Sequence, residues 1–126
     1  MPNFGSLKVK LQLFCDTETA LGPGKADILE AIDRLGSISG AGREIGMSYR
    51  RTWLLVDAMN RCWTEPLVVA LPGARRGAQL TTCGREVLAA FRALEARVME
   101  AALGPEMLAL SRLLRERPRA SQHEPS

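Results

Sequence analysis

Residues 36–61 read GSISGAGREIGMSYRRTWLLVDAMNR, and this stretch decides the fold. Ser37 can cap a first short helix, because its hydroxyl can accept a hydrogen bond from a free amide of the first turn. Gly46 can adopt the left-handed conformation that ends a helix at little cost, and Ser48 lies where a following helix needs its own cap. The pattern predicts two short helices joined by a tight turn, which is the layout of a helix-turn-helix.

The second predicted helix combines an apolar face with a basic start. Residues spaced by four, seven and eleven positions share one face of a helix, and here they predict an inward face: Tyr49, Trp53, Val56 and Asn60. Arg50 and Arg51 are expected to point away from that face.

The first turn of this helix has the chemistry of a DNA contact. An arginine can donate two parallel hydrogen bonds to guanine, and Ser48 can bond a phosphate oxygen. Tyr49 can bury its ring and still offer its hydroxyl to the DNA backbone. We therefore take Ser48, Tyr49, Arg50 and Arg51 as candidate DNA-binding residues. The alternative is an ordinary helical hairpin with two solvated arginines.

The charge of the chain is unevenly placed. Its 126 residues are enough for one domain with its own core, and they carry 17 basic and 14 acidic side chains. A net charge of +3 favours a polyanionic partner only weakly. Between residues 43 and 76, however, there are six arginines and three acids. The basic excess therefore lies on the segments that are predicted to contact DNA.

Cysteine and histidine usage argues against disulfides, zinc and catalysis. Cys15, Cys62 and Cys83 are far apart in the sequence and odd in number, unlike a disulfide framework or a zinc site. The single histidine, His123, lies in a polar tail, so no Ser-His or Cys-His pair is expected. We expect no enzyme activity, no metal and no cofactor. We also find no signal peptide and no apolar run near the roughly 20 residues of a membrane span, and expect a cytoplasmic protein.

The segment before the helix pair predicts a strand, a connection and a helix. Residues 7–13, LKVKLQL, alternate strictly between apolar and polar, which is typical of a half-buried strand. Residues 15–23 are expected to be a connection. An apolar stripe then predicts a helix that Gly36 ends, formed by Ile28, Leu29, Ile32 and Leu35.

A β-hairpin is predicted directly after the helix pair. Residues 67–71, LVVAL, suit a strand bounded by two prolines, and residues 78–81 suit its return. Between them lies a glycine-bounded turn with Arg75 and Arg76, and glycine would allow a close approach to a phosphate backbone. Placed after a helix-turn-helix, this hairpin is the wing of a winged helix, although an ordinary surface hairpin is the alternative.

The C-terminal part predicts two helices and a tail. Thr81 or Thr82 can cap a long helix, and one stripe of it is apolar: Val87, Phe91, Leu94 and Val98. Gly104 and Pro105 separate it from a second helix in residues 104–117, and residues 118–126 are expected to be disordered. The apolar surface either pairs with a second subunit or closes over its own core. Residues 1–103 would then form the DNA-binding domain and its dimerisation helix.

The sequence resembles the N-terminal winged-helix domain of the molybdate-responsive ModE regulators. The resemblance covers roughly residues 24–100 and is carried by several motifs: GSIS at 36–39, Ala41, Gly46-x-Ser48-Tyr49, Trp53, Val56, Met59, Asn60, Leu67-Val68, Leu80-Thr81 and Gly84. It implies a domain that binds double-stranded DNA as a homodimer and regulates transcription. Full-length members carry molybdate-binding domains after the long helix, where this chain ends, so we do not expect molybdate binding.

Together these observations predict a mostly α fold with a small β-hairpin wing, an N-terminal strand and a long C-terminal helix. The function we expect is that of a sequence-specific transcription regulator. A winged-helix module that docks a protein through the same surface is the alternative. Arginines on the reading helix and wing favour DNA over that alternative.

Overall fold

The computed structural model describes residues 7–72 and 77–121. Within them the chain forms five helices and two antiparallel strand pairs. In chain order the elements are β1 (Leu13–Cys15), β2 (Glu18–Leu21), α1 (Pro23–Leu35), α2 (Ile38–Ile45), α3 (Tyr49–Cys62), β3 (Val68–Ala70), β4 (Ala78–Leu80), α4 (Thr82–Ala102) and α5 (Pro105–Leu113). The mostly α architecture with a β-hairpin wing is therefore confirmed.

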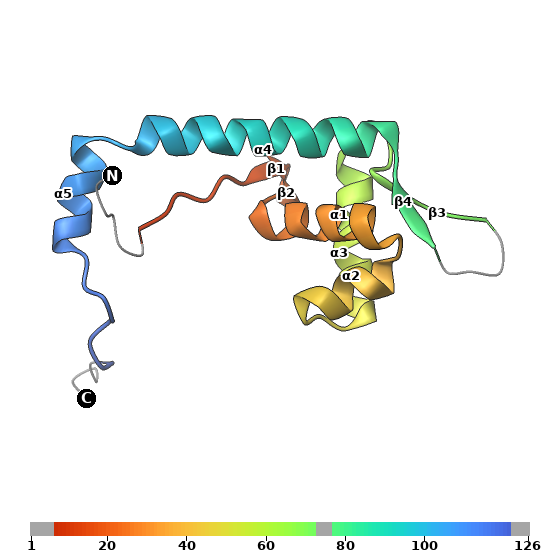
Figure 1. Cartoon of the computed structure of the whole chain (residues 1–126), viewed down its shortest axis with the longest axis horizontal. Coiled ribbons are helices and arrows are strands. Elements are labelled where there is room, and N and C mark those ends of the chain that lie inside the picture. Colours follow the sequence, from red (N-terminus) through yellow and green to blue (C-terminus); the bar gives the residue numbers. More distant parts are fainter. Residues whose placement is uncertain (1–6, 73–76, 122–126) are drawn as a thin grey trace.

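The long helix α4 lies across one side of the molecule, with α1, α2 and α3 grouped beneath one part of it (Figure 1). The β3–β4 hairpin projects at one end and α5 lies at the opposite end (Figure 1). Large apolar side chains from α1, α3, the strands and α4 are fully buried together: Leu21, Ile28, Leu29, Ile32, Met59, Leu67, Leu80 and Phe91. This core holds the helix pair and the hairpin in one unit.

Helix α1 forms as its sequence predicts. Pro23 lies in its first turn, where the missing amide proton is not needed. Ile28, Leu29 and Ile32 are completely buried. Gly36 ends the helix with a left-handed backbone at φ 73°, and its amide donates to the Ile32 carbonyl at 2.8 Å.

The N-terminal strand is displaced from its predicted position. Residues 7–12 form no strand, and β1 begins only at Leu13, where it pairs with β2. The predicted connection at 15–23 was wrong, because it contains β2 and a turn with Asp16 at φ 56°. Of the alternating apolar residues, Leu7, Leu11 and Leu13 are half-buried, whereas Val9 is exposed. Alternation indicates which side chains can face the core, but hydrogen-bond pairing also requires a neighbouring strand.

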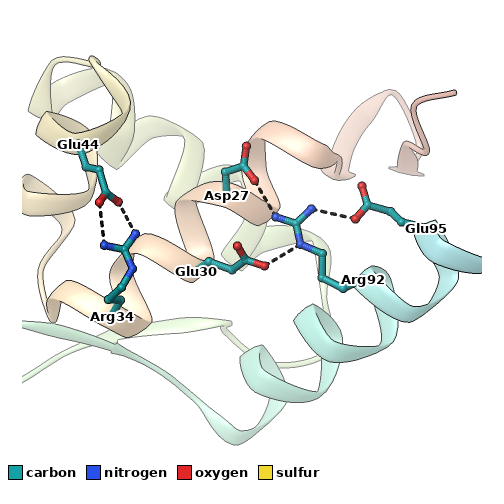
Figure 2. Close-up of polar contacts among 6 residues, drawn as sticks. All are labelled: Asp27, Glu30, Arg34, Glu44, Arg92 and Glu95. Carbon is teal, nitrogen blue, oxygen red and sulfur yellow. Dashed lines mark hydrogen bonds and ion pairs between the residues drawn. The ribbon is translucent and has the colours of Figure 1, made fainter. Parts of the chain in front are cut away.

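An arginine on α4 ties this helix to α1. Arg92 binds three carboxylates, and its Nε and Nη2 donate across to Glu30 at 2.7 Å and Asp27 at 2.6 Å (Figure 2). Its Nη1 bonds Glu95 on α4 itself at 2.8 Å. The hydrogen bond that Arg92 donates to Glu30, together with those to Glu95 and Asp27, raises the pKa of Arg92 above its ordinary value. The network fixes the side of α4 that faces α1.

Helix α4 begins as predicted, with Thr81 as its cap, accepting from the Gly84 amide at 2.9 Å. Its predicted apolar stripe is divided between two environments. Phe91 is buried in the protein's own core, whereas Leu94 is 42% exposed. The break before Pro105 is confirmed, and residues 118–121 of the predicted tail form no helix or strand. The remaining tail residues, 122–126, lie outside the described ranges.

Candidate nucleic-acid interface

Helices α2 and α3 form the predicted pair, with the predicted caps. The Ser37 hydroxyl accepts from the Gly40 amide at 2.9 Å, and the Ser48 hydroxyl accepts from the Arg51 amide at 3.1 Å. Gly46 ends α2 with a left-handed backbone at φ 83°. Each cap satisfies an amide that a helix start leaves free. Local side-chain chemistry therefore determines both ends of the turn.

The two helices cross at a close approach that the sequence did not predict. A methyl group added to Gly42 would lie 2.5 Å from the Thr52 hydroxyl oxygen and 3.2 Å from the Met47 carbonyl oxygen. Thr52 is completely buried, and its hydroxyl donates to the Ser48 carbonyl at 2.8 Å. Only glycine on α2 permits this approach. A single glycine or threonine within a helix is a weak indication of a close contact, so the contact between Gly42 and Thr52 was not predicted from the sequence.

The rotation of α3 about its axis differs from the prediction. Its buried side is formed by Thr52, Val56 and Met59. Tyr49 and Trp53 were predicted to face inward, but they are 51% and 46% exposed, and that part of the prediction was wrong. Apolar spacing suggested a face centred on the aromatic rings. The buried threonine shifts the true face by part of a turn, because its hydroxyl finds an acceptor within the helix.

The four candidate residues lie together at the exposed start of α3. Ser48, Tyr49, Arg50 and Arg51 are all exposed, as a contact to an external partner requires. The Ser48 oxygen accepts a capping bond, which leaves its own proton free to donate. Positive charge from the helix start adds to that of the two guanidinium groups. The arrangement can bind an anionic partner.

The acids near the helix pair bind other arginines, which leaves Arg50 and Arg51 available for an external partner. Arg34 on α1 holds Glu44 on α2 through two bonds of 2.7 and 2.5 Å, and this pairing lowers the pKa of Glu44 (Figure 2). Arg61 at the far end of α3 pairs with Asp57 at 3.1 Å. No acid within the described ranges forms an ion pair with Arg50 or Arg51.

Asn60 connects α3 to the hairpin. Its amide nitrogen donates to the Val68 carbonyl at 3.0 Å, and its oxygen accepts from the amides of Leu67 at 2.9 Å and Val68 at 3.1 Å. At the other strand, the Ala78 amide donates to the Gly36 carbonyl at 2.9 Å. The base of the hairpin is thus bonded to α3, and the end of β4 nearest the turn is bonded to the residue that ends α1.

The hairpin itself is a regular antiparallel pair. Val68 lies opposite Leu80, and Ala70 lies opposite Ala78. The predicted strands at 67–71 and 78–81 are confirmed to within a residue or two at their ends. Arg75 and Arg76, the predicted wing contacts, lie outside the described residues, and their role stays a prediction.

Known proteins match about two thirds of the chain. Over 88 residues it is 43% identical to the molybdenum transport protein ModE of Azotobacter vinelandii, covering 68% of this chain and 33% of that protein. It is 44% identical over 84 residues to the molybdenum-pterin-binding protein MopB of Rhodobacter capsulatus, covering 65% and 31%. It is 33% identical over 93 residues to the transcriptional regulator ModE of Haemophilus influenzae, covering 71% and 34%. The matched part of this chain belongs to the ModE family.

The matched region of this ModE-family chain spans about a third of the length of these curated relatives. No protein-family model matches it. The relatives are named for molybdenum transport, for binding a molybdenum pterin, and for transcriptional regulation.

Two cysteines of this ModE-family chain are neighbours in space, although they are distant in the sequence. Burial raises the pKa of the Cys62 thiol, and the nearby Cys15 thiol adds to the rise. Both are free thiols.

Across residues 7–72 and 77–121 there is no group of three or more histidine, cysteine or acidic side chains that could hold a metal ion. None of the described helices is both long and apolar enough to cross a membrane.

Proposed function

We propose that this chain is a sequence-specific DNA-binding transcription regulator that acts as a homodimer, with α3 in the major groove and the hairpin on the DNA backbone. The observation that carries the proposal is the pair of exposed arginines, without acidic partners in the described chain, at the start of the second helix of a helix-turn-helix. The name of the Haemophilus influenzae relative, transcriptional regulator, supports the same function.

In this proposal the residues at the start of α3 have different roles. Arg50 or Arg51 bonds guanine through two parallel hydrogen bonds, which is the commonest specific contact of an arginine in the major groove. Ser48 and Tyr49 donate their hydroxyl protons to phosphate oxygens and so position the helix. Their exposure and the free hydroxyl proton of Ser48 support these roles.

The hairpin would contact the DNA backbone through Arg75 and Arg76. Support comes from the sequence of the turn and from the two strands on either side of it. Asn60 of α3 bonds the base of β3, and Gly36, the residue that ends α1, bonds β4 near the turn. Phosphate contacts of this kind contribute affinity without reading sequence.

A dimer would be formed by α4 and α5, with α4 in a domain of residues 1–103 and α5 in a C-terminal segment of residues 104–117. Exposed leucines on these helices support it: Leu94, Leu103, Leu110 and Leu113. A groove of about 300 Å³ between α4 and β1 is lined mainly by apolar residues, including Leu13, Trp63 and Leu94. Sedimentation should show a dimer at micromolar concentration that Leu94→Glu weakens. Phe91 is unsuitable for this test because it stabilises the protein's own core.

The test of DNA binding begins with selection of genomic fragments by the purified protein. Arg50→Ala or Arg51→Ala should then cost about 1–3 kcal/mol on the selected operator and relax preference at one base pair. Arg75→Ala and Arg76→Ala should weaken operator and random duplex alike, and each should reduce the slope of affinity against salt by about one unit, because each removes one phosphate neighbour. If all four variants bind both duplexes as the parent does, the proposed interface is wrong.

A second candidate function is docking of a protein through the same surface, without DNA. The exposure of Tyr49, Trp53 and Leu54 on α3 favours it, because apolar residues are enriched in the centres of protein interfaces. DNA selection distinguishes the two functions. A protein that enriches no fragment, yet binds a protein partner through α3, has the second function.

We also propose that the 126-residue chain alone does not bind molybdate, that it is not an enzyme, and that it acts in the cytoplasm. The names of three relatives refer to molybdenum or to a molybdenum pterin. Those relatives are about three times as long as the region that matches. A calorimetric titration with molybdate tests the first of these statements.

A further inference from the structure

Two large apolar side chains lie on the outward face of α3. Trp53 is 46% exposed and Leu54 is 49% exposed, whereas the opposite side of the helix is buried. Neither side chain packs against the hydrophobic core. Single exposed apolar residues are common, but two adjacent ones, one turn after the exposed Tyr49, form a patch that the core does not explain.

Charge surrounds this patch along the helix. Arg50 lies four residues before Leu54 and forms no ion pair with an acid of the described residues, whereas Arg61, seven residues after Leu54, is paired with Asp57 on the same face. Arg43 on α2 is also exposed. A partner that is anionic near Arg43 and Arg50 and that presents an apolar group to Trp53 and Leu54 therefore complements this face. Fewer classes of partner combine negative charge with an apolar group than have either property alone.

Double-stranded DNA meets both requirements at one kind of position. Its phosphates complement the arginines, and the C5-methyl group of thymine is the apolar feature of the major groove. A helix rises 1.5 Å per residue, so Trp53 and Leu54 lie roughly 4.5–6 Å beyond Arg50 along the axis. Base pairs repeat every ~3.4 Å, so this separation corresponds to one or two base-pair steps.

We propose that Trp53 and Leu54 are specificity-determining residues, which select thymine by packing on C5-methyl groups in the major groove. The inference rests on the proposed DNA-binding function and deepens it. It places a preferred thymine one or two base pairs from the base that Arg50 or Arg51 reads. Neither residue belongs to the contacts assigned to the start of α3.

The decisive experiment changes the DNA and leaves the protein intact. In the duplex selected by the parent protein, each thymine is replaced in turn by deoxyuridine, which removes only the methyl group. At one or two positions the parent should bind about fourfold more weakly for each methyl removed, the equivalent of ~0.8 kcal/mol for one buried carbon. At the remaining positions affinity should not change.

Protein variants then identify the side chains that sense the methyl group. Trp53→Gln and Leu54→Gln should bind thymine and deoxyuridine duplexes equally at the sensitive positions, because the packing partner has been removed. Val9→Gln is the matched control, since Val9 is 42% exposed in the segment before β1 and lies beside α4 rather than α3, and it should leave the fourfold difference intact. Circular dichroism should show all three variants folded, because the replaced side chains are substantially exposed.

The outcomes separate this inference from the function on which it rests. If the parent binds selected DNA but its affinity does not change with deoxyuridine at any position, the inference is overturned. A protein partner then becomes the better explanation of the apolar patch. Retention of the full difference by both α3 variants also overturns it. Failure of the parent to bind any duplex refutes the proposed function itself.

Discussion

Replacing Asn60 with alanine should separate the hairpin from α3. The asparagine side chain makes three hydrogen bonds to the first residues of the hairpin, donating to Val68 and accepting from Leu67 and Val68. Leu67 is completely buried and Val68 nearly so, which limits the access of water to their amides. Asn60→Ala therefore removes three bonds and leaves two buried donors without the acceptor they have now.

The expected cost follows from these hydrogen bonds. Each ordinary hydrogen bond contributes about 0.5–1.5 kcal/mol, and a buried donor left without a partner costs about 1–3 kcal/mol. Because the three bonds share one side chain, the contributions do not add fully, and we expect a decrease of about 3 kcal/mol in the free energy of unfolding. Domains of this size have total stabilities of about 5–15 kcal/mol, so the decrease is easily measured.

Urea unfolding followed by circular dichroism measures the decrease. The matched control is Gln79→Ala, an exposed side chain in β4 of the same hairpin, which should change the free energy of unfolding by less than about 0.5 kcal/mol. All proteins are compared at one concentration, because a dimer has concentration-dependent stability. Amide exchange at Leu67 and Val68 should also be faster in Asn60→Ala. If the free energy of unfolding of Asn60→Ala lies within about 0.5 kcal/mol of that of Gln79→Ala, this reasoning is refuted.

Three further predictions concern a close approach, an ion pair and a ligand. A methyl group on Gly84 would lie 2.2 Å from the Leu67 carbonyl oxygen, so Gly84→Ala should lower the free energy of unfolding by at least about 2 kcal/mol. Gly24→Ala, at a helical position of α1 with no atom within 4 Å of the added methyl group, should not lower the free energy of unfolding in the same urea titration. Because Arg34 lowers the folded-state pKa of Glu44, their stabilisation should be present above the unfolded pKa and lost as pH falls through the folded pKa. The difference in stability between the parent and Glu44→Gln should therefore shrink in acid, and a constant difference across the pH series would contradict the assignment. Calorimetric titration of the 126-residue chain with molybdate should give no binding heat, and a clear low-micromolar isotherm would overturn that expectation.

Much of the helix pair could be predicted because its signals are local. Ser37, Ser48 and Thr81 each cap a helix through an amide three residues further on. Gly36 and Gly46 end helices through a backbone conformation that other residues rarely adopt. Such interactions act within one turn of the chain, and a linear sequence displays them directly. The hairpin strands were predictable for the same reason, from the prolines and glycines on either side of them.

The candidate site was only partly predictable. The position of Ser48, Arg50 and Arg51 at the start of α3 follows from the cap and was expected. The exposure of Trp53 was not, because the phase of α3 depends on which residues α1 and α2 cover. The sequence placed Asn60 on the correct helix. Its hydrogen bonds to Leu67 and Val68 were not predicted, because the chain changes direction between α3 and β3 and the sequence does not show how close the two elements come.

The amino-acid sequence by itself determined where helices begin and end, since caps and glycines act over three or four residues. Tertiary structure alone decided how those elements meet. The approach of α2 to α3 at Gly42 and of α4 to the hairpin at Gly84 depends on a missing side chain opposite a particular backbone atom. The pairing of β1 with β2 and the proximity of Cys15 to Cys62 likewise need a partner brought from elsewhere in the chain. Interactions of this kind are properties of pairs, and a linear pattern carries no record of which pairs meet.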